Sequence, residues 1–256
     1  MTDFDDSLWF RRYAPAPEAD HRLVCFPHAG GSASFYLPVA RGLAPRVDVL
    51  SVQYPGRQDR RGEAAFTDIG TLADRLHEGL IRWADRPLVF FGHSMGALVA
   101  FEVARRLAGT AHPAHLFVSG RRAPSTSRAE DLHRLDDDGI AAEIRDLGGT
   151  DAALLADPEL MAMAIPTLRS DYRAVETYEC AADSTVGCPI TALAGDSDPR
   201  ATLAEVEMWA KHTTASFDLT TFPGGHFYLT DHAPRVITLL VDHFEAATPT
   251  RRPSAL

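Results

Sequence analysis

Short apolar runs alternate with longer amphipathic segments along most of the chain. A continuous apolar run bounded by polar or turn residues is typical of a strand buried on both faces of a sheet. The predicted strands are residues 23–26, 47–52, 88–91, 116–118, 190–194 and 217–222. Residues 9–13 are a further candidate, as a strand at the edge of the sheet.

Helical periodicity fills several of the gaps between these runs. The predicted helices are residues 69–83, 97–107, 203–211 and 234–244, and the last begins with proline, which the first helical turn tolerates. Strands that alternate with helices form a parallel sheet covered on both faces. The pattern therefore predicts an α/β fold with a mostly parallel central sheet flanked by helices.

The alternation of strands and helices stops between Ser119 and Cys188. This stretch is too long for an ordinary connection, and it carries helical patterns of its own at 138–147 and 158–178. We predict a core made of residues 1–119 and 189–246, a helical lid insertion at 120–188 and a flexible tail at 247–256.

The composition of the chain limits which partners and cofactors the protein is expected to bind. The chain has 256 residues, which suits one α/β domain, and a net charge of −10, which argues against nucleic acid as a partner. Its three cysteines lack metal-site spacing, no apolar stretch approaches the ~18 residues that span a bilayer, and the acidic first residues do not resemble a secretory signal. We expect a cytoplasmic protein, monomeric, without a metal, a dissociable cofactor or a membrane partner.

Candidate chemistry begins with the segment Gly92-His93-Ser94-Met95-Gly96, which matches G-x-S-x-G between a predicted strand and a predicted helix. In this context the motif is typical of the nucleophile turn of the α/β-hydrolase fold. The chain must reverse sharply there, and side chains at the two glycine positions would collide with neighbouring backbone. We therefore predict an α/β-hydrolase with Ser94 as the nucleophile.

A serine hydroxyl needs a base, and in this fold the acid and then the histidine follow the serine along the chain. His226 ends the glycine-containing loop after the last predicted strand. The loop after residues 190–194 offers two acids, Asp196 and Asp198. We favour Asp198 because it lies further into the loop, and expect Asp196 to hydrogen-bond the turn backbone.

An oxyanion hole requires two N–H donors beside the nucleophile. Met95 supplies one as the residue after the serine, and the loop after the first confident strand supplies the other. That loop reads Phe26-Pro27-His28-Ala29-Gly30-Gly31, whose glycines let backbone approach a substrate. We assign the second donor to Ala29, with His28 as the alternative.

Taken together, the motifs resemble the type II thioesterases of polyketide and nonribosomal peptide biosynthesis. The resemblance covers most of the chain, in FPHAGGSASFY (26–36), YPGRQDR (54–60), FGHSMGALVAFEVARRL (91–107), PTLRSDY (166–172), CPITALAGDSDP (188–199) and FPGGHFYL (222–229). One departure is Tyr54, where the family often has leucine. One candidate for the biosynthetic pathway in which the protein acts is a prodiginine-type pathway.

The resemblance implies hydrolysis of acyl groups from the phosphopantetheine arm of acyl or peptidyl carrier proteins, an editing role in natural-product assembly lines. It places the triad on Ser94, Asp198 and His226 and the oxyanion donors on Ala29 and Met95. The alternatives are a small-molecule carboxylesterase, an acyltransferase with the same triad and a non-catalytic binding module.

The resemblance also implies that the insertion shapes an acyl chamber. Met161 and Met163 are candidate substrate-binding residues, because flexible thioethers tolerate varied acyl shapes. The alternative is that the apolar residues around them pack the lid onto the core.

Two groups of arginines follow predicted strand ends and are candidates for guiding an acidic carrier or its phosphate. They are Arg57, Arg60 and Arg61, and Arg121 and Arg122. The alternative for each arginine is a solvated ion pair with a neighbour such as Asp59 or Glu63.

Overall fold

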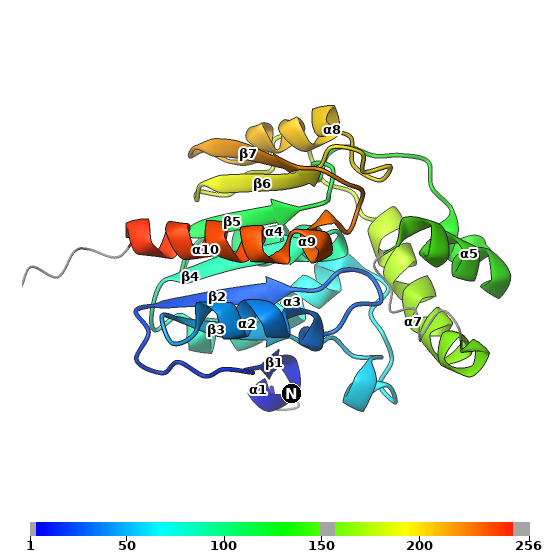
Figure 1. Ribbon diagram of the computed structural model, residues 1–256, viewed down its shortest axis with the longest axis horizontal. Helices are drawn as coiled ribbons and strands as arrows, with labels where there is room; N and C mark the ends of the chain where they lie inside the picture. The colour runs from blue at the N-terminus through cyan, green and yellow to red at the C-terminus, as the bar shows by residue number, and fades with distance from the viewer. Residues whose placement is uncertain (1–3, 149–156, 248–256) are drawn as a thin grey trace, which may run out of the picture.

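A central sheet organises the computed structural model, which describes residues 4–148 and 157–247. In these residues the sheet has seven strands in the order β1-β3-β2-β4-β5-β6-β7, and all neighbours are parallel except β1 and β3 (Figure 1). The strands are β1 (Phe10–Arg11), β2 (His21–Phe26), β3 (Val47–Val52), β4 (Leu88–His93), β5 (His115–Ser119), β6 (Ile190–Gly195) and β7 (Phe217–Phe222). The predicted α/β arrangement is confirmed.

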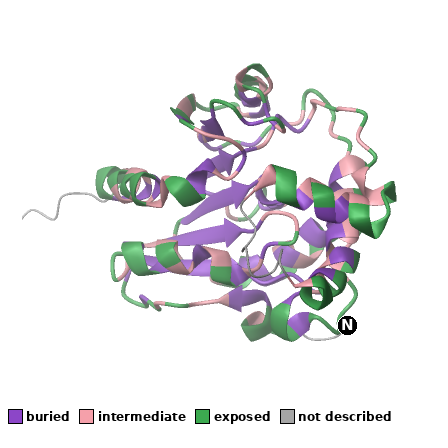
Figure 2. Ribbon diagram, turned by 45° about the vertical axis from the view of Figure 1, so that its right-hand side comes forward, coloured by how far each residue is buried: buried purple, intermediate pink, exposed green. Residues whose placement is uncertain are grey.

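Helices cover both faces of this sheet. On one side lie α2 (Leu37–Leu43) and α10 (Ala233–Ala247), and on the other lie α3 (Ile69–Leu80) and α4 (Met95–Arg106). The apolar run of β2 serves both faces, because Leu23 and Cys25 pack in one core while Val24 and Phe26 pack in the other. Strands β2 to β6 are buried between helices whose outer sides are exposed (Figure 2). The edge strand β7, which the apolar pattern predicted as buried, is only partly covered. No described helix is long and apolar enough to cross a membrane.

Several local predictions differ from the structure. The edge strand expected at 9–13 is the two-residue β1, because the preceding residues form the short helix α1 (Asp6–Trp9). The helices expected at 69–83 and 203–211 each end in 3₁₀ turns, after α3 and after α8 (Leu203–Glu207). Helix α2 was not predicted, since it is too short for a periodic pattern. The expected tail lies outside the described residues apart from its first residue, which ends α10.

The order of the strands creates a crevice at one edge. From β2 the chain moves to β3 on one side, and then to β4 on the other side of β2. The loops that leave the carboxyl ends of β2 and β4 therefore run in opposite directions. Ligands of open α/β sheets bind between two such loops. These strand ends point toward α5 (Asp137–Leu147) and α7 (Pro158–Glu176), at the right of Figure 1.

Helices α5 and α7 belong to the segment that interrupts the strand pattern. An aspartate caps the start of each, Asp136 through the N–H of Gly139 and Asp157 through that of Glu159. The two helices share a small apolar cluster made of Ile140, Ala141, Ile144, Met161, Ile165 and Leu168. The segment thus packs largely on itself as a helical pair over the strand ends.

The turn from β4 to α4 brings backbone segments very close together. A Cβ atom at Gly96 would lie 1.9 Å from the carbonyl oxygen of Phe26, and one at Gly92 would lie 2.2 Å from the oxygen of Gly96. Real Cβ atoms do not approach backbone this closely. Both glycines are therefore required by the packing of the turn against β2.

Replacing Gly96 by alanine should destabilise the fold by at least about 2 kcal/mol, because the added methyl group must push two backbone segments apart. The matched control is Gly109→Ala, where an added Cβ would meet nothing within 4 Å. That change should alter stability by less than about 0.5 kcal/mol. Denaturant unfolding of both variants checks this, and equal midpoints would contradict the packing argument.

Candidate active site

Ser94 occupies the turn between β4 and α4 with a left-handed backbone, at φ 54° and ψ −117°. This conformation costs a non-glycine residue roughly 1–3 kcal/mol, so the surrounding structure must hold it. The Ser94 N–H donates to the carbonyl of Ser119 at 2.8 Å, which ties the turn to the end of β5. Met95 begins α4, so its N–H has no acceptor within the helix.

His226 and Asp198 meet in the interior. Nδ1 of His226 lies 2.8 Å from Oδ2 of Asp198, and both side chains are buried. The other carboxylate oxygen of Asp198 accepts the N–H of Arg200 at 2.8 Å. An aspartate on Nδ1 holds the imidazole in the tautomer that leaves Nε2 free to accept a proton. Asp196 instead accepts the N–H of Gly224 at 3.0 Å, in the turn.

One small cavity joins the predicted catalytic residues. Ser94, His226 and Ala29 all line it, and its volume is about 40 Å³. The N–H of Ala29 donates no hydrogen bond within the described part of the chain. The N–H groups of Ala29 and Met95 are therefore available beside the serine, as an oxyanion hole needs.

Two further histidines adjoin His226 and stay neutral. The ring centroid of His93 lies 5.0 Å from that of His226, and His28 lies 5.9 Å from His93. Burial lowers the pKa of His28 to about 3 and that of His93 well below its ordinary value. Because neither ring carries a charge at neutral pH, no cation is stacked against His226.

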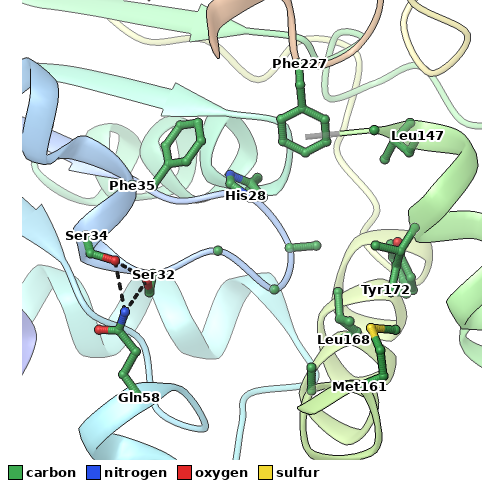
Figure 3. Close-up of a pocket in the computed structure, with 16 residues that line it drawn as sticks. His28, Ser32, Ser34, Phe35, Gln58, Leu147, Met161, Leu168, Tyr172 and Phe227 are labelled. Atoms are coloured by element: carbon green, nitrogen blue, oxygen red, sulfur yellow. Dashed lines mark hydrogen bonds between the residues drawn. The ribbon is translucent and has the colours of Figure 1, made fainter. Parts of the chain in front are cut away.

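A larger cavity of about 490 Å³ lies beside the small one, and Ala29, Leu147 and Tyr172 line both. Figure 3 shows Phe35, His28 and Phe227 on its core side and Met161, Leu168 and Tyr172 on the side of α7. Most of its lid-side wall is apolar, from α5 and α7.

The structure separates the two predicted methionines. Met161 is 5% exposed and lines the larger cavity, whereas Met163 is 62% exposed and lines neither cavity. Side chains two positions apart on a helix are separated by about 200° of rotation, so Met163 faces outward when Met161 faces inward. The substrate-binding expectation therefore continues with Met161 alone.

A buried ion pair holds the loop that carries Ala29, and sequence analysis missed it. Asp171 on α7 accepts the N–H of Gly30 at 2.7 Å and pairs with Arg57, whose Nε donates to the carbonyl of Gly31 at 2.8 Å. The signal was available in the segments YPGRQDR and PTLRSDY, which are part of the family resemblance and carry Arg57 and Asp171.

The docking hypothesis fails for three of the five arginines. Arg57, Arg60 and Arg122 are only 6%, 4% and 3% exposed, so they cannot reach a partner protein. Their ion-pair partners are Asp171, Glu63 and Glu130, of which Glu63 is exposed. Burying an arginine is tolerable only with such partners. Arg61 is exposed, and Arg121 lines the small cavity.

The fold and the site define the class: this is a serine hydrolase of the α/β-hydrolase type. A family model described as a thioesterase domain matches residues 21–244. The chain belongs to the thioesterase family, as the sequence motifs predicted. No group of three His, Cys, Asp or Glu residues in the described ranges could hold a metal ion.

The chain is also similar in sequence and structure to individual named thioesterases. The chain is 53% identical to a probable cadicidin biosynthesis thioesterase of Streptomyces griseus, over 97% of this chain and 70% of that protein. It is 48% identical to the type II thioesterase BorB of the borrelidin cluster, with a TM-score of 0.87 over 95% of this chain and all of BorB. RedJ from the prodiginine pathway of Streptomyces coelicolor is 39% identical, with a TM-score of 0.83 over 89% of this chain and 87% of that one.

The two loop aspartates should differ sharply in their effect on turnover. Asp198→Asn should lower kcat by up to about 10⁴-fold, because the amide favours the wrong tautomer of His226. Asp196→Asn should keep most activity, because it loses only a turn hydrogen bond. Steady-state hydrolysis of a short acyl thioester measures both. A larger loss in Asp196→Asn would overturn the choice of acid.

Proposed function

We propose that this protein hydrolyses acyl groups from the phosphopantetheine arm of acyl or peptidyl carrier proteins, as an editing enzyme of a natural-product assembly line. The observation that carries this proposal is the shared cavity of Ser94, His226 and Ala29, which adjoins the apolar chamber through Ala29, Leu147 and Tyr172. Relatives named for cadicidin biosynthesis and for the borrelidin biosynthetic cluster support the substrate class.

In the first step, His226 accepts the proton of Ser94 as the hydroxyl oxygen attacks the thioester carbon. The carbonyl oxygen becomes an oxyanion that accepts hydrogen bonds from the N–H groups of Ala29 and Met95, and losing one such donor costs ~2.7–4 kcal/mol in known enzymes. The C–S bond then breaks, and His226 returns the proton to the departing pantetheine sulfur. An acyl-Ser94 ester and a free thiol result.

In the second step, His226 accepts a proton from water, whose oxygen attacks the ester carbon. The same two N–H groups stabilise the second oxyanion, and the proton returns to the oxygen of Ser94 as the acid departs. Asp198 stabilises the imidazolium in both steps. Because one chain supplies every group, we propose that a monomer is active. We also propose that it works in the cytoplasm, beside the carrier proteins that it acts on.

We propose that residues 120–188 act as a lid whose inner side shapes the acyl chamber. The support is that α5 and α7 pack largely on each other and contribute Ile144, Leu147, Met161 and Leu168 to the cavity wall. An apolar wall stabilises an alkyl chain by about 0.8 kcal/mol per buried CH₂. Longer acyl groups should therefore bind more tightly until the chamber is full.

A panel of acyl carrier proteins with acyl groups of varied length tests the function, with intact-protein mass spectrometry as the readout. Wild-type protein should release the acyl group and leave the holo carrier, while Ser94→Ala should leave the acyl carrier intact apart from slow residual hydrolysis. If free esters are cleaved and carrier thioesters are not, the small-molecule esterase alternative is correct. Release as a transferred acyl group would indicate an acyltransferase.

The two methionines provide a matched pair for the chamber. Met161→Trp should lower kcat/KM for long acyl thioesters by about tenfold or more relative to acetyl, because the indole fills space that the chain needs. Met163→Trp should leave the chain-length profile unchanged, because that side chain is exposed. A uniform fall across all lengths in Met161→Trp would mean that Met161 only packs the lid.

A further inference from the structure

Arg121 follows β5 and lines the same small cavity as Ser94 and His226. Its position is fixed by its backbone, because its carbonyl accepts the indole N–H of the buried Trp209 at 2.8 Å. The preceding Gly120 has a φ of 57° and donates its N–H to the carbonyl of Leu193 at 2.9 Å. The backbone therefore holds the guanidinium stem at the cavity wall.

The cavity wall carries four charged side chains, and three of them have partners. Glu130 and Arg200 pair with each other at 3.3 Å. Glu176 accepts two backbone N–H groups at 2.8 and 3.2 Å and also pairs with His133. Only the side chain of Arg121, among these four, makes no hydrogen bond or ion pair within residues 4–148 and 157–247.

An arginine in this state is unusual. Its Nε atom is buried without an acceptor, and burial lowers the pKa of Arg121 to about 9, so the guanidinium is still charged at neutral pH. Leaving the buried Nε–H of a charged group without an acceptor among the described residues costs free energy, and native structures rarely do so without a reason. A ligand that brings an acceptor oxygen to this wall would remove that cost.

The charge balance favours a neutral acceptor. Two arginines and two glutamates line the cavity, Arg121 and Arg200 against Glu130 and Glu176. An anionic ligand would therefore leave an excess negative charge in a confined site. An amide oxygen satisfies the guanidinium without adding charge.

We infer that Arg121 binds the amide carbonyl of the phosphopantetheine arm nearest to the thioester sulfur. This inference rests on the proposed function, in which the acyl chain occupies the apolar chamber of Met161 and Leu168. The arm must then leave the thioester carbon along another wall, and Arg121 marks the polar wall of the cavity at Ser94. The first amide of the arm lies only two methylene groups from the sulfur, within the reach of a side chain beside the nucleophile.

Two propionyl thioesters of equal chain length test this inference. The N-acetylcysteamine thioester carries the amide, and the pentanethiol thioester replaces the amide by methylene groups. Arg121→Met should lower kcat/KM for the first substrate by roughly tenfold or more, the value of a hydrogen bond to a charged donor, and leave the second within about twofold. The matched control, Arg134→Met, removes an exposed arginine of the same segment and should change neither value.

Equal losses on both thioesters would overturn the inference, because Arg121 would then act on the chemistry or the fold. No loss on either would also overturn it. A loss confined to malonyl thioester, with propionyl unaffected, would identify an acyl carboxylate as the ligand instead. If Arg121→Met does not fold, Arg121→Lys replaces it and should lower the amide-to-alkyl preference by a smaller factor. Failure of wild-type protein to cleave any thioester would contradict the proposed function rather than the role of Arg121.

Discussion

The left-handed backbone at Ser94 is the constraint on which the rest of the site depends. It forces the chain from β4 into α4 within one residue, which directs the side chain away from the sheet and leaves the N–H of Met95 at a helix start. The strain persists because the turn is held from two sides. Gly92 and Gly96 allow backbone contact, and Ser119 accepts the Ser94 N–H.

Two ion pairs, one of them buried, connect this site to the helical insertion. Asp171 on α7 and Arg57 together fix the loop that supplies the Ala29 N–H. On the other side, Arg200 holds Asp198 through its backbone and pairs with Glu143 on α5 through its side chain. The insertion is thus attached to the loop of Ala29 and to the loop of Asp198, so a displacement of either helix would disturb groups that we propose to act in catalysis.

Sequence patterns could predict the features that depend on neighbouring residues in the chain, namely the strands and the turn at Ser94. Five strands were predictable because a strand buried on both faces is largely apolar, whereas β7 lies at the sheet edge and is only partly buried. Ser94 was predictable because the turn admits few residues. Side-chain orientation was not predictable in the same way. The rotation of α7, which separates Met161 from Met163, depends on its packing against α5. The pairing of Arg57 with Asp171 joins segments more than a hundred residues apart. An unpaired Arg121 also has no signature in a sequence.

The central claim is that Ser94 is a nucleophile activated by His226. Labelling with a fluorophosphonate, which reacts with an activated serine and traps it covalently, tests this claim most directly when the modified peptide is mapped by mass spectrometry. The account predicts one adduct on the peptide that contains Ser94, its absence in Ser94→Ala and much slower labelling in His226→Ala. An adduct on another residue, or labelling that persists in Ser94→Ala, would contradict it.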